Sequence, residues 1–193
     1  HRISLELTRN ILETLGGHER ELSAFDQHTS FIRLNYYPPC PNPAPEDADL
    51  VPEFGELGIS HHTDAGAVTV LLQDEQPGLQ VMRDGHWHTL QRPVGSLIIN
   101  IGDIVQVWSN DRYKAPLHRV LAHANADRIS IPYFLNPDYG YDYRPLNKSA
   151  SKESPRYQPI NWGEFRSQRS AGDYADVGKE IQISDYALAA DQS

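Results

Sequence analysis

Two imidazoles and one carboxylate are spaced so that they can bind a single metal ion. His62 and Asp64 are separated by one residue, and in an extended segment such side chains point to the same face. His118 comes much later, after several predicted strands, and can reach the same interior from a distant strand. Two histidines and one carboxylate on one side of a metal leave other coordination positions open, as in non-haem Fe(II) centres that activate O2. We therefore expect His62, Asp64 and His118 to form a catalytic metal site.

Arg128 and Ser130 form a second pair that shares one face of a predicted strand. The guanidinium fork binds a carboxylate through two parallel hydrogen bonds and keeps its charge. It suits a diacid whose other end chelates the metal, and 2-oxoglutarate is such a diacid. Tyr37 can add a hydrogen bond to the same carboxylate. The alternatives are an ordinary exposed strand pair for Arg128 and Ser130, and a packed ring for Tyr37, with Tyr36 as the other candidate tyrosine.

Further side chains near these positions have other interpretations. His61 lies beside the first predicted ligand and should point to the opposite face. His86 and His88 follow a predicted turn without a suitable partner nearby, so we expect them to face solvent. Phe134 lies at even spacing from Ser130 and is expected to face the same cavity, as core or as substrate wall.

Short β-rich runs follow one another from Phe31 onward and must position these side chains. Strands are expected at Ala67 to Leu72, Ser96 to Ile101, Ile104 to Trp108, Leu117 to Ala122 and Arg128 to Leu135. The clearest hairpin spans Gly78 to Leu90, where Asp84-Gly85 suits the positive φ angles of a type I′ turn. The predicted fold class is mainly β, a double-stranded β-helix (jelly roll) with flanking α-helices.

Helical patterns stand on both sides of the β-rich region. Ile3, Leu7, Ile11 and Leu15 recur every four residues before Gly16-Gly17, which predicts an amphipathic helix and its end. Later, Asn161 is followed three residues on by Glu164, which predicts the start of a short helix.

The pattern divides the chain into a helical lead-in over 1–30, a barrel over 31–137 and a C-terminal extension over 138–193. Because the first residues read like the middle of a helix, we expect an N-terminal part to precede them. The stretch from Pro38 to Gly58 is rich in proline and acidic residues, so it is expected to be a long loop, either a lid over the cavity or an insertion.

The amino-acid composition argues against some classes of binding partner. The formal net charge is -9 and there is no run of Lys or Arg, which argues against nucleic acid or an anionic membrane and favours a small-molecule substrate. The single cysteine, Cys40, allows no intramolecular disulfide and no cysteine-rich zinc site, so a cytoplasmic location is the default expectation. No apolar stretch is long enough to span a membrane. The oligomeric state is left open.

The order of these segments resembles the 2-oxoglutarate/Fe(II)-dependent dioxygenase superfamily, in its isopenicillin N synthase-like branch. The segments that carry the resemblance are Asn35-Tyr-Tyr37-Pro-Pro-Cys-Pro, His62-Thr-Asp64, Pro77-Gly-Leu-Gln-Val81, Asn100-Ile-Gly-Asp103, His118-Arg-Val120 and Arg128-Ile-Ser130. The branch includes plant flavonoid, gibberellin and ethylene-forming oxygenases. The resemblance covers about Phe31 to Pro137.

The resemblance implies iron held by His62, Asp64 and His118, and 2-oxoglutarate held by Arg128, Ser130 and Tyr37. With Fe(II), 2-oxoglutarate and O2, and ascorbate as a reductant where one is needed, such an enzyme hydroxylates, desaturates or cyclises a small molecule and releases succinate and CO2.

Two other functions remain open. The segment Tyr113-Lys-Ala-Pro116 resembles isopenicillin N synthase itself, which works without 2-oxoglutarate, as an oxidase of the aminocyclopropane-carboxylate type also does. A non-catalytic β-sandwich that keeps the metal triad for stability belongs to a different class. A structural metal site would more naturally be closed by four protein ligands, which speaks against that class.

Overall fold

A computed structural model describes residues 1–17, 19–146, 154–175 and 181–189 of the 193-residue chain. The helices are α1 (Arg2–Leu15), α2 (Glu19–Ser23), α3 (Asp103–Trp108), α4 (Trp162–Ala175) and the 3-10 helix η1 (Ile183–Tyr186). The strands are β1 (Phe31–Ile32), β2 (Asn35–Tyr37), β3 (Leu57–His62), β4 (Val68–Gln73), β5 (Leu79–Arg83), β6 (His86–Thr89), β7 (Ile98–Ile101), β8 (His118–Leu121), β9 (Arg128–Leu135), β10 (Asp142–Tyr143) and β11 (Ile160–Asn161).

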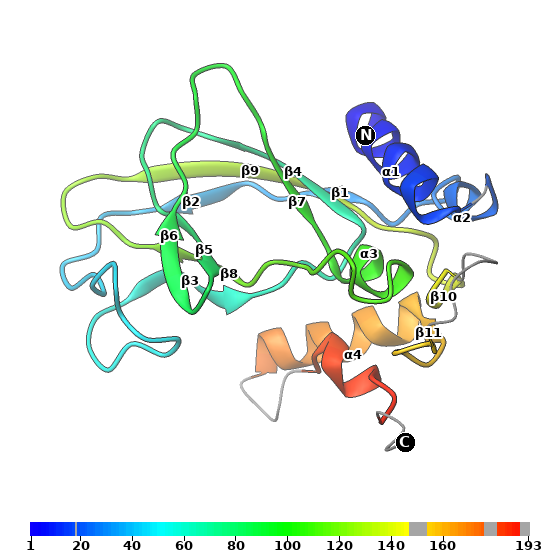
Figure 1. The fold of residues 1–193 in the computed structure, drawn as a ribbon. Helices are drawn as coiled ribbons and strands as arrows, with labels where there is room; N and C mark the ends of the chain where they lie inside the picture. Colours follow the sequence, from blue (N-terminus) through cyan, green and yellow to red (C-terminus); the bar gives the residue numbers. More distant parts are fainter. Residues whose placement is uncertain (18, 147–153, 176–180, 190–193) are drawn as a thin grey trace.

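Two antiparallel sheets face each other, as expected for a jelly roll. One has the order β1-β9-β4-β7, with β2 also paired to β9, and the other has the order β3-β8-β5-β6. Figure 1 shows them as an upper and a lower layer, with the helices gathered at one end. Each sheet contains strands from both halves of the β-rich region. Side chains that are distant in sequence therefore meet between the two layers.

The predicted end of α1 and the predicted start of α4 are confirmed, but α4 has 14 residues and is not the short helix expected. Helix α1 ends at Gly16, whose φ of 70° lies in the left-handed region that favours glycine at a helix C-terminus. At α4, the Asn161 side chain accepts a hydrogen bond from the Glu164 N–H at 3.1 Å, as the sequence indicated. The core includes Leu12, Trp108 and Trp162, so both flanking segments bury apolar side chains together with the β-rich region.

The strand predictions are largely confirmed. Strand β9 spans the predicted residues, and β4, β7 and β8 lie within one residue or two of the predicted ranges. The β5–β6 hairpin turns at Asp84 and Gly85, which have φ angles of 50° and 78°, as a type I′ turn requires.

The predicted strand from Ile104 to Trp108 is wrong, because these residues form helix α3. Ile104, Val105, Val107 and Trp108 are all fully buried, so the run has apolar residues on every side and no helical periodicity to read. Its β-branched residues favour a strand locally, and the burial of its apolar residues in the core as a short helix overrides that preference.

The stretch from Pro38 to Gly58 forms the expected long loop up to the start of β3. It packs on the outer face of the smaller sheet, where the buried Arg119 donates hydrogen bonds to the carbonyl oxygens of Glu46, Ala48 and Asp49 at 2.8 to 3.0 Å. No described residue of this loop lines either cavity beside the metal triad. The structure therefore gives the loop an anchored position on the side away from the cavity rather than that of a lid.

The predicted C-terminal extension is described only in part, since 147–153, 176–180 and 190–193 lie outside the described residues. No helix in the described ranges is both long enough and apolar enough to cross a membrane.

Candidate active site

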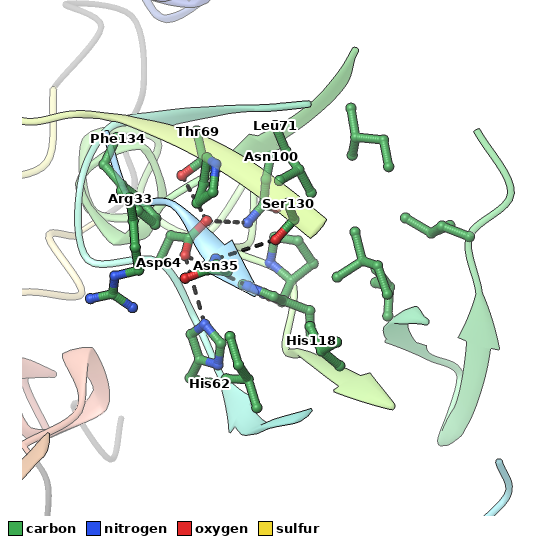
Figure 2. Close-up of a pocket in the computed structure, with 18 of the residues that line it drawn as sticks. Arg33, Asn35, His62, Asp64, Thr69, Leu71, Asn100, His118, Ser130 and Phe134 are labelled. Carbon is green, nitrogen blue, oxygen red and sulfur yellow. Dashed lines mark hydrogen bonds and ion pairs between the residues drawn. The ribbon is translucent and has the colours of Figure 1, made fainter. Parts of the chain in front are cut away.

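The structure brings the three predicted metal ligands together between the two sheets (Figure 2). His62 and His118 are directly opposite each other in the β3–β8 pair. The Oδ1 atom of Asp64 lies 3.9 Å from Nε2 of His62 and 3.6 Å from Nε2 of His118. The sequence analysis assumed that the first two ligands lie in one extended segment, whereas His62 ends β3 and Asp64 follows in a loop. Their convergence on one point is as predicted.

Each imidazole is oriented by a backbone carbonyl group two residues earlier in the chain. Nδ1 of His62 lies 2.8 Å from the carbonyl oxygen of Ser60, and Nδ1 of His118 lies 3.0 Å from that of Pro116. Because a carbonyl oxygen only accepts, Nδ1 carries the proton in each ring and the Nε2 lone pair is left for a metal. Burial, and then the neighbouring His118, lower the pKa of His62, which favours the neutral, metal-binding form.

The carboxylate of Asp64 is held by two donors that the sequence reasoning did not assign. Thr69 donates its hydroxyl to Oδ2 at 2.7 Å, and the Asn100 amide donates to the same oxygen at 2.6 Å. Asp64 is buried, so these bonds fix its rotamer and leave Oδ1 facing the imidazoles. Thr69 and Asn100 are polar residues inside apolar strands, a pattern that signals a buried polar partner.

Helix α3 holds the metal-ligand loop through its first N–H groups. The N–H of Asp103 donates to the carbonyl oxygen of Asp64 at 2.8 Å, and that of Ile104 donates to Gly66 at 3.2 Å. A Cβ atom on Gly102 would lie 2.1 Å from the Gly66 oxygen. The approach of helix and loop therefore requires glycine at position 102.

A buried ion pair fixes the same loop from helix α4. Arg169 donates to Oδ2 of Asp103 at 2.6 Å and, through its other terminal nitrogen, to the carbonyl oxygen of Thr63 at 2.7 Å. Thr63 stands between the two ligands His62 and Asp64. Burial raises the pKa of Asp103 to about 6, with Arg169 opposing the shift. The sequence reasoning missed this pair.

Arg128 and Ser130 line the same cavity from the start of β9, a strand of the larger sheet, whereas His62 and His118 come from the smaller one. Strand β2 pairs with them so that Tyr37 is opposite Arg128, and Asn35 is opposite Ser130. Both side chains of the pair are buried, which rules out an exposed strand pair. Tyr37 also faces the cavity.

The Arg128 guanidinium is only partly satisfied. Its Nη2 donates to Gln73 at 2.7 Å, whereas Nε and Nη1 are buried without a hydrogen-bond partner in the described part of the chain. Burial lowers the pKa of Arg128, against the opposing influence of Tyr37 and Asp74. Unpaired buried N–H groups on a cation carry a large desolvation cost, which a bound carboxylate would offset.

The Ser130 hydroxyl contacts two other polar side chains of the cavity. Asn35 donates to its Oγ at 3.2 Å, and the Tyr37 hydroxyl lies 3.4 Å from it. The Arg128 guanidinium carbon lies 5.1 Å from the centre of the Tyr37 ring. Tyr36 is 61% exposed, so of the two tyrosines Tyr37 is the one positioned toward Arg128 and Ser130.

The cavity between these two sets of residues has a volume of about 300 Å³. Its remaining wall is mostly apolar and includes Leu71, Leu79, Val81, Ile98 and Val120. Phe134 lines it, as expected from its spacing. His61 instead bonds to the Leu50 carbonyl oxygen, while His86 and His88 are exposed. Cavities of this size that are apolar with a few convergent polar groups are typical of small-molecule sites.

Comparisons with known proteins agree with this geometry. The chain is 38% identical over 161 residues to gibberellin 2-beta-dioxygenase 6 of Oryza sativa subsp. japonica, covering 83% of this chain and 40% of that protein. It is also 38% identical over 142 residues to flavonol synthase/flavanone 3-hydroxylase of Petunia hybrida, covering 73% and 38% respectively. The chain thus spans about two fifths of the length of these relatives.

Solved structures give the same result. A crystal structure of JOX2 in complex with 2OG, Fe and JA matches with a TM-score of 0.73 at 34% identity, covering 86% of this chain and 48% of that one. The crystal structure of a full-length Neurospora crassa protein in complex with alpha-KG and thymine matches with a TM-score of 0.74 at 28% identity, covering 90% and 53%. Residues 28–137, more than half of the chain, match the family model of the 2OG-Fe(II) oxygenases. With the jelly roll and the His-Asp-His cluster in place, the chain belongs to the 2OG-Fe(II) oxygenase superfamily.

Proposed function

We propose that this chain is the catalytic part of a Fe(II)- and 2-oxoglutarate-dependent oxygenase that oxidises a small organic molecule with release of succinate and CO2. The observation that carries the proposal is that two sets of polar residues line the same cavity. The cavity is lined by His62, Asp64 and His118 and also by Arg128, whose buried nitrogens Nε and Nη1 lack a hydrogen-bond partner among the described residues.

The residues fit the metal. Each ligand has one atom held by the protein and another directed at the common point, through the backbone bonds of the histidines and the Asn100 and Thr69 bonds to Asp64. Three protein ligands leave positions open for a cosubstrate and O2. When bound there, Fe(II) and 2-oxoglutarate supply the activation of O2 and the oxidising power.

Side chains of this chain bind and orient the cosubstrate and exclude water. Arg128 and Ser130, with Tyr37 beside them, bind and orient the distal carboxylate of 2-oxoglutarate. Asn35 holds the Ser130 hydroxyl in place. The apolar wall excludes water from the reacting atoms and positions the substrate.

Two other observations bear on the substrate and on the cellular location. The relatives differ in the small molecules that their structures contain, JA in one and thymine in another, so these comparisons do not carry one substrate over to this chain. The single cysteine is free and buried, which supports a reducing compartment such as the cytoplasm as the place of action.

A function without 2-oxoglutarate would leave Arg128 to bind a carboxylate of the substrate. The experiment that separates the two is anaerobic addition of 2-oxoglutarate to the Fe(II)-loaded protein, followed by visible absorption. We expect a metal-to-ligand charge-transfer band that is absent in His118→Ala and needs a higher 2-oxoglutarate concentration in Arg128→Leu.

Arg83→Leu is the matched control, because Arg83 is an exposed arginine at the β5–β6 turn. It should titrate like the unmodified protein. Bound iron with no band at any 2-oxoglutarate concentration would contradict the proposal and favour an oxidase that does not use this cosubstrate.

A further inference from the structure

Helix α3, at the end of the sheets where the helices gather, contacts the chain beside two of the three predicted metal ligands (Figure 1). At its start, the Asp103 N–H donates to the carbonyl oxygen of Asp64, as described above. Three residues later, the Gln106 side chain accepts a hydrogen bond from the N–H of Ala115 at 2.8 Å. Ala115 lies three residues before His118. The same helix is therefore bonded to the loop of one ligand and to the segment that leads to another.

The bond to Ala115 affects the orientation of His118. Residues 114–117 lie outside the helices and strands, and Pro116 has no N–H to donate. The carbonyl oxygen of Pro116 lies 3.0 Å from Nδ1 of His118 and orients that imidazole. Because Ala115 and Pro116 are adjacent, a displacement of Ala115 moves this carbonyl group and the imidazole bonded to it.

The Gln106 amide is itself held in one orientation. A backbone N–H only donates, so Oε1 faces Ala115, and Nε2 donates to the Tyr157 hydroxyl at 2.8 Å. That hydroxyl donates to Oδ1 of Asp111 at 2.6 Å. Burial, and then the hydrogen bond to Asp111, raise the pKa of Tyr157 to about 12, so the hydroxyl keeps the proton that it donates. The hydrogen bonds therefore run in one direction from Tyr157 and fix the amide between two partners.

The turn that follows α3 depends on the same C-terminal segment. Asn110 and Asp111 have φ angles of 54° and 70°, in the left-handed region that is unfavourable for residues other than glycine. Oδ1 of Asn110 accepts a hydrogen bond from the Arg156 N–H at 2.8 Å, and its Nδ2 donates to the Ser154 carbonyl oxygen at 3.1 Å. Asp111 accepts the tyrosine bond given above. Residues 154–157 thus hold this turn through its side chains.

From these contacts we infer that Gln106 is a positioning residue for the metal ligand His118, and that Tyr157 holds Gln106 in place. Gln106 does not line the cavity and acts through the backbone of 115–116. Thr69 and Asn100 hold a different ligand, so the effect of Gln106 should be confined to His118. The inference rests on the proposed function for the identity of the metal, Fe(II).

The first test is anaerobic titration of the protein with Mn(II). Gln106→Met should raise the dissociation constant about ten-fold, because His118 loses the support of its orienting carbonyl group. Gln106→Glu keeps an oxygen for the Ala115 N–H and should stay within about three-fold of the unmodified protein. Gln158→Met is the matched control, because Gln158 is an exposed glutamine in the same C-terminal segment. Its affinity should be unchanged.

A spectroscopic test shows which ligand is affected. With Co(II) bound, the Nδ1 protons of His62 and His118 should give separate, paramagnetically shifted NMR signals, told apart by their nuclear Overhauser contacts with Ser60 and Pro116. In Gln106→Met we expect the His118 signal to shift and to exchange faster with solvent, while the His62 signal stays as it is. A general loss of stability would change both signals.

Tyr157→Phe tests the second part of the inference with a smaller change. Without the hydroxyl, the Gln106 amide loses one of its two partners, so we expect about a three-fold rise in the Mn(II) dissociation constant and the same shift at His118 alone. The double variant Gln106→Met/Tyr157→Phe should bind Mn(II) no more weakly than Gln106→Met, because Tyr157 acts through Gln106. Additive losses would overturn the role of Tyr157.

The remaining outcomes separate this inference from the proposed function. The inference is overturned if Gln106→Met binds Mn(II) like the control, if Gln106→Glu binds as weakly as Gln106→Met, or if both imidazole signals change together. Mn(II) binding does not require 2-oxoglutarate. An unmodified protein that binds Mn(II) but gives no charge-transfer band with Fe(II) and 2-oxoglutarate would therefore contradict the proposed function alone. If the unmodified protein binds no metal, both fail.

Discussion

Arg169 and Asp103 form a buried ion pair, with Nη1 of the arginine 2.6 Å from Oδ2 of the aspartate. The pair connects helix α4 to the start of helix α3, whose first N–H groups hold the metal-ligand loop. Arg169 also bonds to Thr63 in that loop. Helix α4 therefore helps to position the predicted metal ligands although it contributes none of them.

Replacing Arg169 by Met should destabilise the fold by about 3 to 5 kcal/mol, because it leaves the Asp103 carboxylate buried without a counter-charge. Adding Asp103→Asn should restore part of the loss by removing that charge. Chemical denaturation of the single and double variants measures both effects. Arg156→Met is the control, since Arg156 pairs with Asp111 at 3.6 Å and is 64% exposed. Its change should stay below about 1 kcal/mol. If Arg169→Met and Arg156→Met lowered the free energy of unfolding equally, the buried pair of Arg169 and Asp103 would contribute no more than an exposed one.

Removal of Asn100 should weaken the metal site. In Asn100→Ala, the Asp64 carboxylate loses one of its two orienting donors, so we expect the dissociation constant for Fe(II) or Mn(II) to rise about 10- to 100-fold. Thr69→Val removes the other donor and should act in the same direction. Metal titration under anaerobic conditions measures the change. Asn10→Ala, on the exposed side of α1, should leave metal affinity as it is. Unchanged affinity in both site variants would show that Asp64 does not depend on these bonds.

Gly102→Ala should prevent the close contact of helix α3 with the metal-ligand loop. The added Cβ meets backbone atoms of Gly66 and Asp64, which cannot move aside as a flexible side chain can. We expect a destabilisation of at least about 2 kcal/mol together with a loss of metal affinity. Gly140→Ala is the matched control, because the nearest atom to its added Cβ is the side-chain oxygen of Asp138 at 3.1 Å. A Gly102→Ala protein as stable as that control would mean that helix and loop can separate without cost.

Arg119→Met should release the long acidic loop. The guanidinium lies 4.2 Å from the centre of the Trp87 ring and bonds to three loop carbonyl oxygens, so its loss removes the anchor on this face of the sheet. Hydrogen exchange of the amides in residues 46–49 should speed up, while exchange in β9 should not. Because this loop lines neither cavity, 2-oxoglutarate binding should be retained. Unaltered exchange in the loop would place its anchor elsewhere.

Much of the site could be predicted because its parts carry local patterns. The spacing of His62 and Asp64 and of Arg128 and Ser130 fixes which side chains share a face, and strand β9 was predicted at its observed bounds. The β5–β6 turn follows from the chemistry of Asp84-Gly85, which few other sequences satisfy.

The rest depends on contacts that no local pattern shows. The apolar residues of helix α3 are all buried, so the run fits a strand equally well. Asp103 and Arg169 are 66 residues apart, and neither spacing nor periodicity relates them. Gln106 and Tyr157 likewise meet only after the C-terminal segment has packed against α3. For these residues the tertiary fold, rather than the sequence around them, determines the environment.

The central claim is tested most directly by the conversion of 2-oxoglutarate to succinate. The purified protein is incubated with Fe(II), O2 and isotopically labelled 2-oxoglutarate, first without substrate, where slow uncoupled turnover is expected, and then with candidate small molecules. We expect labelled succinate above the no-protein background, rising with an accepted substrate and absent in His118→Ala. No succinate from a protein shown to hold both iron and 2-oxoglutarate would contradict it.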